Sequence, residues 1–410
     1  MRKCFAALLA LSLLLTLIPA AGLCLGECGK TKDDYVSLTS LTENYGFLLG
    51  ASYNYGQATG NQPYMDFVKT HFATVTCTNE TKAYSLLDQN ACKKAEDGMP
   101  VMNYNQADKM IAWARDNGLK VRGHVLVWDA YMCDWFFREG YSSTAPYVDQ
   151  EAARARTKSY IEQVITHFEQ EFPGVIFCWD VVNEAIGDGV GEWDASDARH
   201  LRTVRSGKDN LFKTYVGDDY VEFAFLCAKD TVESLGVDIR LFYNDYNMFF
   251  SDKRQSALAL VESINSYAVD ENGQYRKLID GIGMQGYIGG YGKQQDCLND
   301  GHITRIQASI NMYARAGMEV HITEMAVRNF LDDEATVALH ADFYGRLFEM
   351  FKTVNSGENK PLTCVAIWGV TDAPTATGYN YNLISPFGGL ITEKYEIKTS
   401  FDTVHAVMSK

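Results

Sequence analysis

The chain has 410 residues, of which 47% are hydrophobic and 22% are charged, and this composition excludes an intrinsically disordered protein. Its 52 acidic residues outnumber its 37 basic residues, which gives a formal net charge of -15. Such an excess of negative charge disfavours nucleic acid and anionic membrane surfaces as partners, because both attract basic proteins. A neutral ligand fits this charge better.

The first 22 residues have the pattern of a secretory signal peptide. Arg2 and Lys3 give the positive start, residues 5–18 form an apolar stretch too short for a typical membrane span, and residues 19–22 are small or suited to cleavage. We therefore expect a secreted, extracellular protein in which residues 23–44 lead into the folded part. The alternatives are an uncleaved anchor and lipid attachment at Cys24, which the preceding Leu23 fits poorly.

From residue 45 onward, short apolar runs alternate with longer amphipathic stretches, as in successive βα units. Helical spacing is clear over residues 161–172 and 221–232. The candidate strands are 46–52, 72–77, 120–128, 175–182, 240–244, 281–285, 319–323 and 364–369. Eight strands alternating with helices predict an α/β fold, a (β/α)8 TIM barrel. No linker or low-complexity stretch divides residues 45–410, so we expect one domain there.

Ten cysteines are spread along the chain without a close pair or a histidine at zinc-like spacing, so we expect no metal site. Cys77, Cys178 and Cys364 lie in apolar, strand-like runs and are expected in the core. A disulfide between Cys77 and Cys92 is an open alternative, because spacing alone cannot fix connectivity.

Two strand-like runs, WDVVNEA at 179–185 and HITEM at 321–325, lead up to a glutamate. A carboxylate inside a buried strand would be costly to desolvate, whereas at the strand's carboxyl end it can open into a cleft. The carboxyl ends of all eight strands of a TIM barrel meet at the active-site face. We therefore expect Glu184 and Glu324 to converge there, although 140 positions separate them in the sequence.

Six motifs, taken together, resemble those of glycoside hydrolase family 10, the endo-β-1,4-xylanases. They are RGHVLVW at 122–128, WDVVNEA at 179–185, YNDYN at 243–247, GIGMQ at 281–285, ITE at 322–324 and WGVTD at 368–372. They occur in the family's order, one for each successive strand, over nearly the whole mature chain. The resemblance implies a monomeric, retaining endo-β-1,4-xylanase that hydrolyses internal bonds of xylan by double displacement, without metal or cofactor. The first 22 residues add the expectation that this enzyme is secreted.

The resemblance also assigns roles to individual residues. Glycosidic bond cleavage needs a proton donor for the leaving oxygen and a carboxylate that faces the anomeric carbon. By resemblance these are Glu184 as acid/base and Glu324 as nucleophile, and Asn183 binds the 2-hydroxyl of the sugar under attack. His124 and Trp128, which would share one face of a strand, line the glycone side. The further substrate contacts it implies are Asn79, Lys82, Tyr246, Asn247, Gln285 and Trp368.

Several positions depart from the family pattern. Thr78 replaces an acidic residue, Asp129 and Tyr287 each replace a histidine, Ala326 replaces an aspartate, and no second tryptophan follows within 371–376. In the family, the histidine and aspartate at the positions of Tyr287 and Ala326 are partners beside the nucleophile, so their joint absence indicates one coupled change.

Tyr287 lies two residues past Gln285 and shares its face of the strand, so it should point into the cleft. We hypothesise that its hydroxyl donates a hydrogen bond directly to Glu324, which would make the aspartate partner unnecessary. The alternative is that Tyr287 only packs against the sugar and so serves in substrate binding.

Two other functions remain open because both ends of the site are altered. One is a retaining hydrolase of another β-linked or decorated plant glycan. The other is a non-catalytic xylan-binding protein on the same scaffold. The presence of both glutamates argues against this second alternative, since decay usually removes a catalytic carboxylate first.

Overall fold

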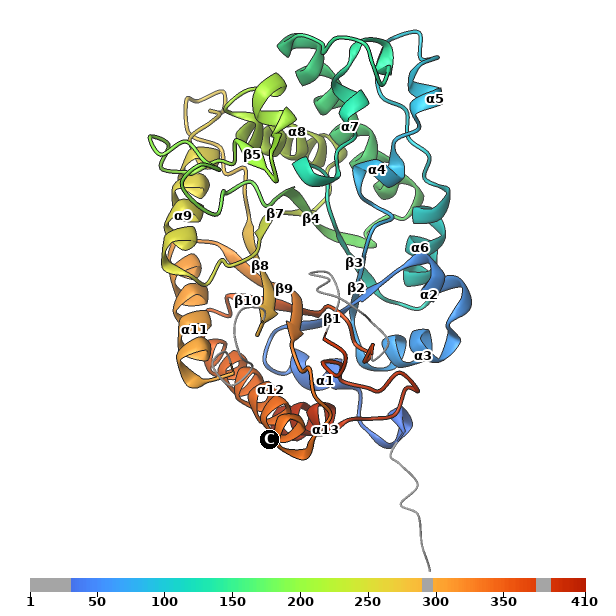
Figure 1. Ribbon diagram of the computed structural model, residues 1–410, viewed down its shortest axis with the longest axis vertical. Coiled ribbons are helices and arrows are strands. Elements are labelled where there is room, and N and C mark those ends of the chain that lie inside the picture. Colours follow the sequence, from blue (N-terminus) through green and yellow to red (C-terminus); the bar gives the residue numbers. More distant parts are fainter. Residues whose placement is uncertain (1–30, 290–297, 374–384) are drawn as a thin grey trace, which may run out of the picture. The chain divides into compact units, whose positions relative to one another are not determined.

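The computed structural model describes residues 31–289, 298–373 and 385–410, and within them eight parallel strands close into a barrel surrounded by helices (Figure 1). Around the barrel the strand order is β1-β10-β9-β8-β7-β4-β3-β2. The strands are β1 (Leu48–Tyr53), β2 (Thr74–Cys77), β3 (Lys120–Gly123), β4 (Ile176–Asn183), β7 (Arg240–Asp245), β8 (Gly281–Ile288), β9 (Glu319–Val327) and β10 (Leu362–Ile367). The predicted (β/α)8 TIM barrel is confirmed. The expected signal peptide and Cys24 lie outside the described residues.

The outer layer consists of the helices that connect successive strands. The α-helices are α1 (Leu38–Glu43), α2 (Tyr55–Gly60), α3 (Gln62–His71), α4 (Ala83–Leu86), α5 (Gln89–Cys92), α6 (Asn105–Asp116), α7 (Gln150–Glu171), α8 (Tyr220–Leu235), α9 (Ser251–Asn265), α11 (Asp300–Arg315), α12 (Glu334–Val354) and α13 (Thr399–Met408). Short helical turns are η1 (Lys32–Asp34), η2 (Asp129–Tyr131), η3 (Asp134–Phe137), η4 (Glu139–Tyr141) and the π-helix η5 (Phe212–Val216). The strands β5 (Val204–Arg205) and β6 (Lys208–Asp209) form an antiparallel hairpin outside the barrel.

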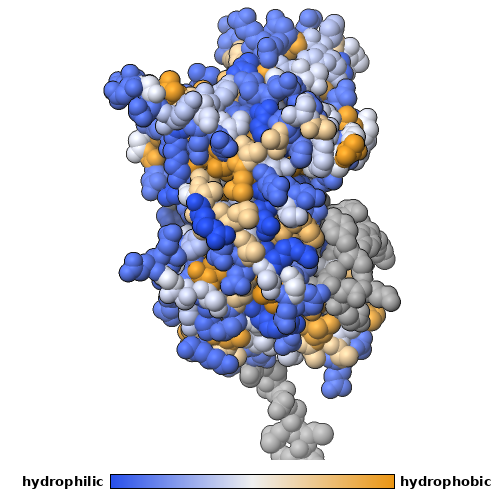
Figure 2. Space-filling model, turned by 90° about the vertical axis from the view of Figure 1, so that its left-hand side faces the viewer, coloured by the Kyte–Doolittle hydropathy of each residue, from blue (hydrophilic) through white to orange (hydrophobic). Residues whose placement is uncertain are grey.

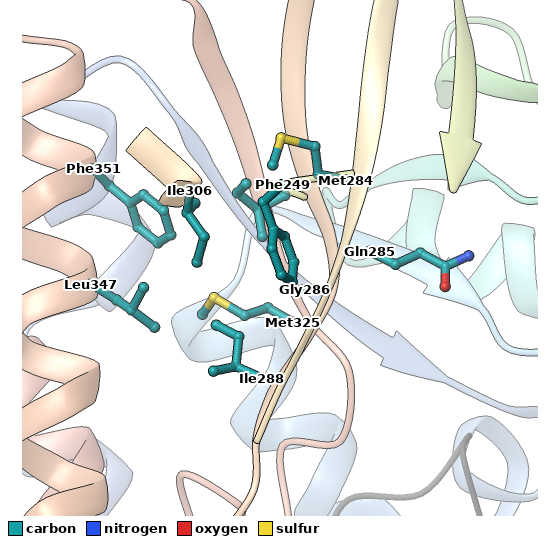
Figure 3. A pocket seen from close by; sticks show the side chains of 10 residues that line it. Phe249, Met284, Gln285, Gly286, Ile288, Ile306, Met325, Leu347 and Phe351 are labelled. Atoms are coloured by element: carbon teal, nitrogen blue, oxygen red, sulfur yellow. The ribbon is translucent and has the colours of Figure 1, made fainter. Parts of the chain in front are cut away.

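Strand alternation separates the apolar layer of the barrel from its polar interior. Met284, Ile288 and Met325 are buried and point from β8 and β9 toward α12, where Leu347 and Phe351 meet them (Figure 3). Gln285, between Met284 and Gly286, points the opposite way (Figure 3). Because side chains alternate along a strand, the same two strands support the core with one face and present polar groups with the other.

Seven of the eight predicted strands agree with the observed ones to within a few residues at either end, whereas the prediction for 120–128 is wrong in its second half. Strand β3 ends at Gly123, which pairs with Trp179, while Val127 pairs with Val182 in an isolated bridge. From Gly123 to Val127 the chain advances four residues, whereas β4 advances only three from Trp179 to Val182, so the β3–β4 ladder is interrupted. His124 and Trp128 therefore do not share the face of one strand.

The surface over α9 and α11 is mostly hydrophilic, with apolar residues gathered in a narrow band (Figure 2).

Cys77, Cys178 and Cys364 are buried, as predicted. Cys77 and Cys92 are both free thiols, so the disulfide considered between them is not formed. In the described ranges, no helix combines the length and apolarity needed to cross a membrane.

Candidate active site

A cleft of about 1000 Å³ opens at the carboxyl ends of the barrel strands. Eleven of the twelve predicted site residues line it, namely Asn79, Lys82, His124, Trp128, Glu184, Tyr246, Asn247, Gln285, Tyr287, Glu324 and Trp368. The twelfth, Asn183, is buried next to Glu184 and is hydrogen-bonded to Gln285 of the lining. The fold therefore brings the whole predicted set together.

A bulge in β9 turns Glu324 into the cleft. Gln285 pairs with Thr323 and Tyr287 pairs with Ala326, so β9 uses three residues where β8 uses two. Thr323 already points into the barrel, where its hydroxyl donates to Asn244 at 2.6 Å. Strict alternation would turn Glu324 outward, but its φ of 53° lies in the left-handed region and reverses that direction.

Glu184, at the end of β4, is also turned into the cleft by a left-handed backbone conformation. The preceding Asn183 points inward, since its amide is hydrogen-bonded to Asn244 and Gln285. Glu184 then has a φ of 54°, and its backbone N–H donates to the carbonyl of Asn244 at 2.9 Å. Two consecutive side chains can therefore face the same cleft, at a conformational cost of roughly 1–3 kcal/mol per left-handed residue.

The carboxyl group of Glu184 is buried between a cation and an amide. Arg205 Nη1 lies 2.9 Å from Oε2, and Gln285 Nε2 donates to Oε1 at 3.0 Å. Burial raises the pKa of Glu184 to about 7; the charge of Arg205 opposes this rise, while Asp245 and Glu324 add to it. A carboxyl group with this pKa can hold a proton near neutrality, as a general acid must.

The carboxylate of Glu324 has neutral donors around it. Tyr287 Oη donates to Oε2 at 2.7 Å, which confirms the hypothesised direct hydrogen bond. Asn244 Nδ2 donates to Oε1 at 3.1 Å. Ala326 lies opposite Tyr287 in the β8–β9 ladder, so the two positions that depart from the family are neighbours, as one coupled change requires.

Three buried amides join the two glutamates. The oxygen of Asn183 accepts from Asn244 Nδ2 at 3.0 Å and from Gln285 Nε2 at 3.2 Å, and these same two donors reach Glu324 and Glu184. Within the described part of the chain the Nδ2 of Asn183 is buried without a hydrogen-bond partner. Since an unpaired buried donor is costly, this N–H₂ is suited to a ligand hydroxyl.

One wall of the cleft is aromatic and is fixed by a buried ion pair. Asp180 accepts from His124 Nδ1 at 2.8 Å and is paired with Arg122. Burial alone would raise the pKa of Asp180, but Arg122 and His124 outweigh it and lower the value. The ring of His124 packs edge-on against Trp128 and Trp368, with centroids 6.0 and 6.2 Å apart.

Lys82 lies in this wall, close to both glutamates. Its Nζ donates to Asn79 Oδ1 at 3.2 Å and lies 5.0 Å from the ring centroid of Trp128 and 4.5 Å from that of Tyr131. Burial lowers the pKa of Lys82, while the negative charges of Glu324 and Glu184 oppose this shift. The lysine therefore belongs to the cleft and is not a solvated surface charge.

Tyr246, which directly follows β7, is held by a cluster of charges. Its hydroxyl donates to Asp188 and accepts from Arg202 Nη2 at 3.0 Å, and Lys253 Nζ lies 3.6 Å from its ring centroid. The next residue, Asn247, has a φ of 57° and also lines the cleft. Both residues therefore lie in the cleft, where a substrate can contact them.

Sequence reasoning missed other residues of the site, among them Asn244, which is buried behind the cleft, and Tyr131 and Arg205, which line it. Asn244 stood inside a recognised motif, and its position next to the end of a strand could have revealed it. Tyr131 follows the RGHVLVW motif by three residues, but an isolated tyrosine carries no signal of its own. Arg205 lies in an aperiodic segment, and no local pattern indicates its partners.

In the ranges that the structure describes, no group of three or more His, Cys, Asp or Glu side chains is arranged to hold a metal ion.

Comparisons with known proteins agree with this geometry. A family model described as Glycosyl hydrolase family 10 matches residues 37–404. A putative endo-1,4-beta-xylanase of Caldicellulosiruptor saccharolyticus is 33% identical over 297 residues, which are 71% of this chain and 86% of that protein. Endo-1,4-beta-xylanase A of Thermotoga maritima is 32% identical over 75% of this chain but only 25% of its own length.

Among solved structures, a Clostridium thermocellum endo-1,4-beta-D-xylanase 10B fragment, complexed with xylohexaose, superposes with a TM-score of 0.75. The match covers 91% of this chain and 68% of that one at 23% identity, so it supports the fold.

Proposed function

This chain belongs to glycosyl hydrolase family 10, and on that basis we propose that it is a retaining endo-β-1,4-xylanase that cleaves internal bonds of xylan. The observation that carries the proposal is the unequal setting of two glutamates in one cleft. Glu184 has a pKa raised to about 7, whereas Glu324 accepts hydrogen bonds from Tyr287 and Asn244. A retaining glycosidase needs one carboxyl group as acid/base and one as nucleophile.

In the first step Glu324 attacks the anomeric carbon while Glu184 gives its proton to the leaving glycosidic oxygen. The bond to the leaving sugar breaks and a covalent glycosyl-enzyme forms. In the second step Glu184, now ionised, takes a proton from water, and the resulting hydroxide displaces Glu324. Two inversions leave the product with the β configuration of the substrate.

The N–H₂ of Asn183, which has no partner among the described residues, can bind the reacting sugar in this mechanism. It is fixed by Asn244 and Gln285 in the amide network that also contacts both glutamates. A hydrogen bond to the 2-hydroxyl of the reacting sugar would strengthen as the oxocarbenium-like transition state forms. Asn183 would thereby contribute more to the rate than to substrate affinity.

Support for xylan as the substrate comes from the relatives, whose names describe them as endo-1,4-beta-xylanases. The test is product analysis on unbranched xylan, branched xylans, mixed-linkage glucan and cellulose. Internal cleavage of xylan, with early NMR spectra showing β-anomer first, is the expected result. Early α-anomer would exclude the double displacement. Binding to xylan without release of any product would favour a non-catalytic protein, and cleavage of another glycan in the panel would redirect the substrate assignment.

We also propose that the protein is secreted, because its first 22 residues combine a basic start, an apolar stretch and a small-residue cleavage region. Amino-terminal sequencing of the protein from the culture medium should begin close to residue 23. Recovery only from the cell interior, with Met1 retained, would contradict this.

A further inference from the structure

The acid/base carboxyl of Glu184 is held by an ion pair that comes from outside the barrel strands. Arg205 Nε and Nη2 each lie 2.9 Å from one oxygen of Asp129, which makes the pair bidentate. The remaining nitrogen, Nη1, reaches Glu184 Oε2 at 2.9 Å, and Nη2 also donates to the backbone carbonyl of Glu184 at 2.9 Å. One guanidinium thus fixes both the backbone and the carboxyl group of Glu184.

The hairpin that carries Arg205 is built for this placement. Strands β5 and β6 pair antiparallel, and Ser206 and Gly207 join them with φ values of 50° and 76°. Two successive positive φ angles are typical of a tight type I′ turn, whose twist matches that of the flanking strands. The turn leaves Arg205 about one-fifth exposed, with its head group in the cleft lining.

The residue type at position 129 suits a pairing with arginine. Asp129 stands where the family motif has a histidine, and Arg205 lies in the segment between β4 and η5 that has little periodicity. A histidine at position 129 could not give the two parallel acceptor oxygens that a guanidinium takes from a carboxylate. The departure at position 129 and the arginine therefore form one coupled feature.

We propose that the Asp129–Arg205 pair positions Glu184 and sets the upper pH limit of catalysis, with its two charges acting on Glu184 in opposite directions. Arg205 is the positioning residue in direct contact, and Asp129 offsets part of its charge. The proposal rests on the proposed retaining mechanism, in which Glu184 must be protonated to act as the acid.

Other charged and polar groups surround Glu184 and stay constant in the test. They are Asp245 from β7, Gln285 and Tyr287 from β8, Glu324 from β9, Arg202 near its backbone carbonyl, and Lys82 across the cleft. Asp245 and Glu324 raise the pKa of Glu184, while Gln285 lowers it. Changes made only at positions 129 and 205 therefore isolate the contribution of the pair.

The experiment compares pH profiles of kcat/KM for a xylo-oligosaccharide. Arg205→Met removes the cation, so the pKa of Glu184 should rise and the alkaline limb should move up by about 1–3 pH units. Asp129→Asn leaves Arg205 without its countercharge, so the alkaline limb should move down, by about 1 unit. Arg205→Lys keeps the charge but loses the bidentate geometry, so the limb should stay near its original pH while kcat falls.

Lys208→Met is the matched control, because Lys208 is exposed and pairs with Arg205 in the same hairpin. It makes the same charge change without contact to Glu184 and should leave the profile unchanged. Shifts of the limb in the same direction for Arg205→Met and Asp129→Asn would overturn the proposal. Loss of rate with an unmoved limb in both variants would also overturn it, by leaving only a structural role.

A second readout does not depend on activity. The side-chain carboxyl carbon of Glu184 can be followed by ¹³C NMR and assigned by its absence in Glu184→Gln. Its titration midpoint should rise in Arg205→Met and fall in Asp129→Asn. This titration tests the ion pair even if xylan is not the substrate. A failure of the proposed xylanase function can therefore be distinguished from a failure of the proposed role of the Asp129–Arg205 pair. An unmoved midpoint in both folded variants contradicts the pair's role.

Discussion

The surroundings of Glu184 and Glu324 differ in where they come from in the fold. Glu324 is contacted by Asn244 and Tyr287, which lie on the barrel strands β7 and β8. Glu184 is contacted by Gln285 of β8 but also by Arg205, from a hairpin outside the barrel. The nucleophile is thus held by the rigid scaffold, whereas the acid/base is partly controlled by a loop. Loops tolerate sequence change better than strands do, so the acid's pKa can be tuned without disturbing the barrel.

Replacing the nucleophile Glu324 should reduce activity more than any other change. Glu324→Ala removes the group that forms the covalent intermediate, so xylan and aryl glycosides should both remain uncleaved. The loss should exceed the roughly 10²–10⁴-fold that general acid catalysis supplies. The measurement is the rate at which the aryl leaving group is released. A near-native rate would show that a residue other than Glu324 is the nucleophile.

Glu184→Ala should distinguish the acid/base role of Glu184 from the nucleophilic role of Glu324. Cleavage of xylan should fall by roughly 10²–10⁴-fold, because a sugar leaving group needs a proton. Aryl glycosides with good leaving groups should still react in the first step, and added azide should restore turnover by replacing the activated water. Identical behaviour of Glu184→Ala and Glu324→Ala on aryl substrates would show that the two roles are assigned wrongly.

Tyr287→Phe sharpens the account of the nucleophile's surroundings. Losing a hydrogen bond to a charged group costs roughly 1.5–3 kcal/mol, which corresponds to a rate reduction of about 10- to 150-fold. Tyr160→Phe is a suitable control, because the hydroxyl of that buried tyrosine has no hydrogen-bond partner among the described residues. Thermal unfolding should be little changed in both variants. Near-native turnover of Tyr287→Phe would leave only the packing role considered for Tyr287.

The smallest expected effect is a pH dependence of the unmodified enzyme. Burial raises the pKa of Glu184 to about 7, so the protonated acid is present below that pH and is lost above it. Xylan cleavage should therefore decline as pH rises through about 7. Single-turnover cleavage of an aryl glycoside with a good leaving group should lack this decline, because its first step needs no proton. A shared alkaline limb would assign it to a group other than Glu184.

Much of the site could be predicted because its residues lie in motifs at the ends of barrel strands. Glu184, Gln285, Glu324 and Trp368 follow apolar runs whose strand character is evident, and the barrel then fixes where these ends meet. The direct bond from Tyr287 followed from strand alternation and from the joint loss of two family residues. His124 and Trp128 were placed correctly for a wrong reason, since β3 ends before them.

The amino-acid sequence is enough to identify the eight strands and their order, because apolar periodicity is a local signal. It also determined which carboxylates lie at strand ends. Only the folded chain shows that Asn183 and Glu184, and likewise Thr323 and Glu324, point to the same side, because left-handed backbone at both glutamates overrides alternation. It alone paired Arg205 with Asp129 and Glu184, because an ion pair between distant loops depends on where those loops lie in space, which no local pattern encodes.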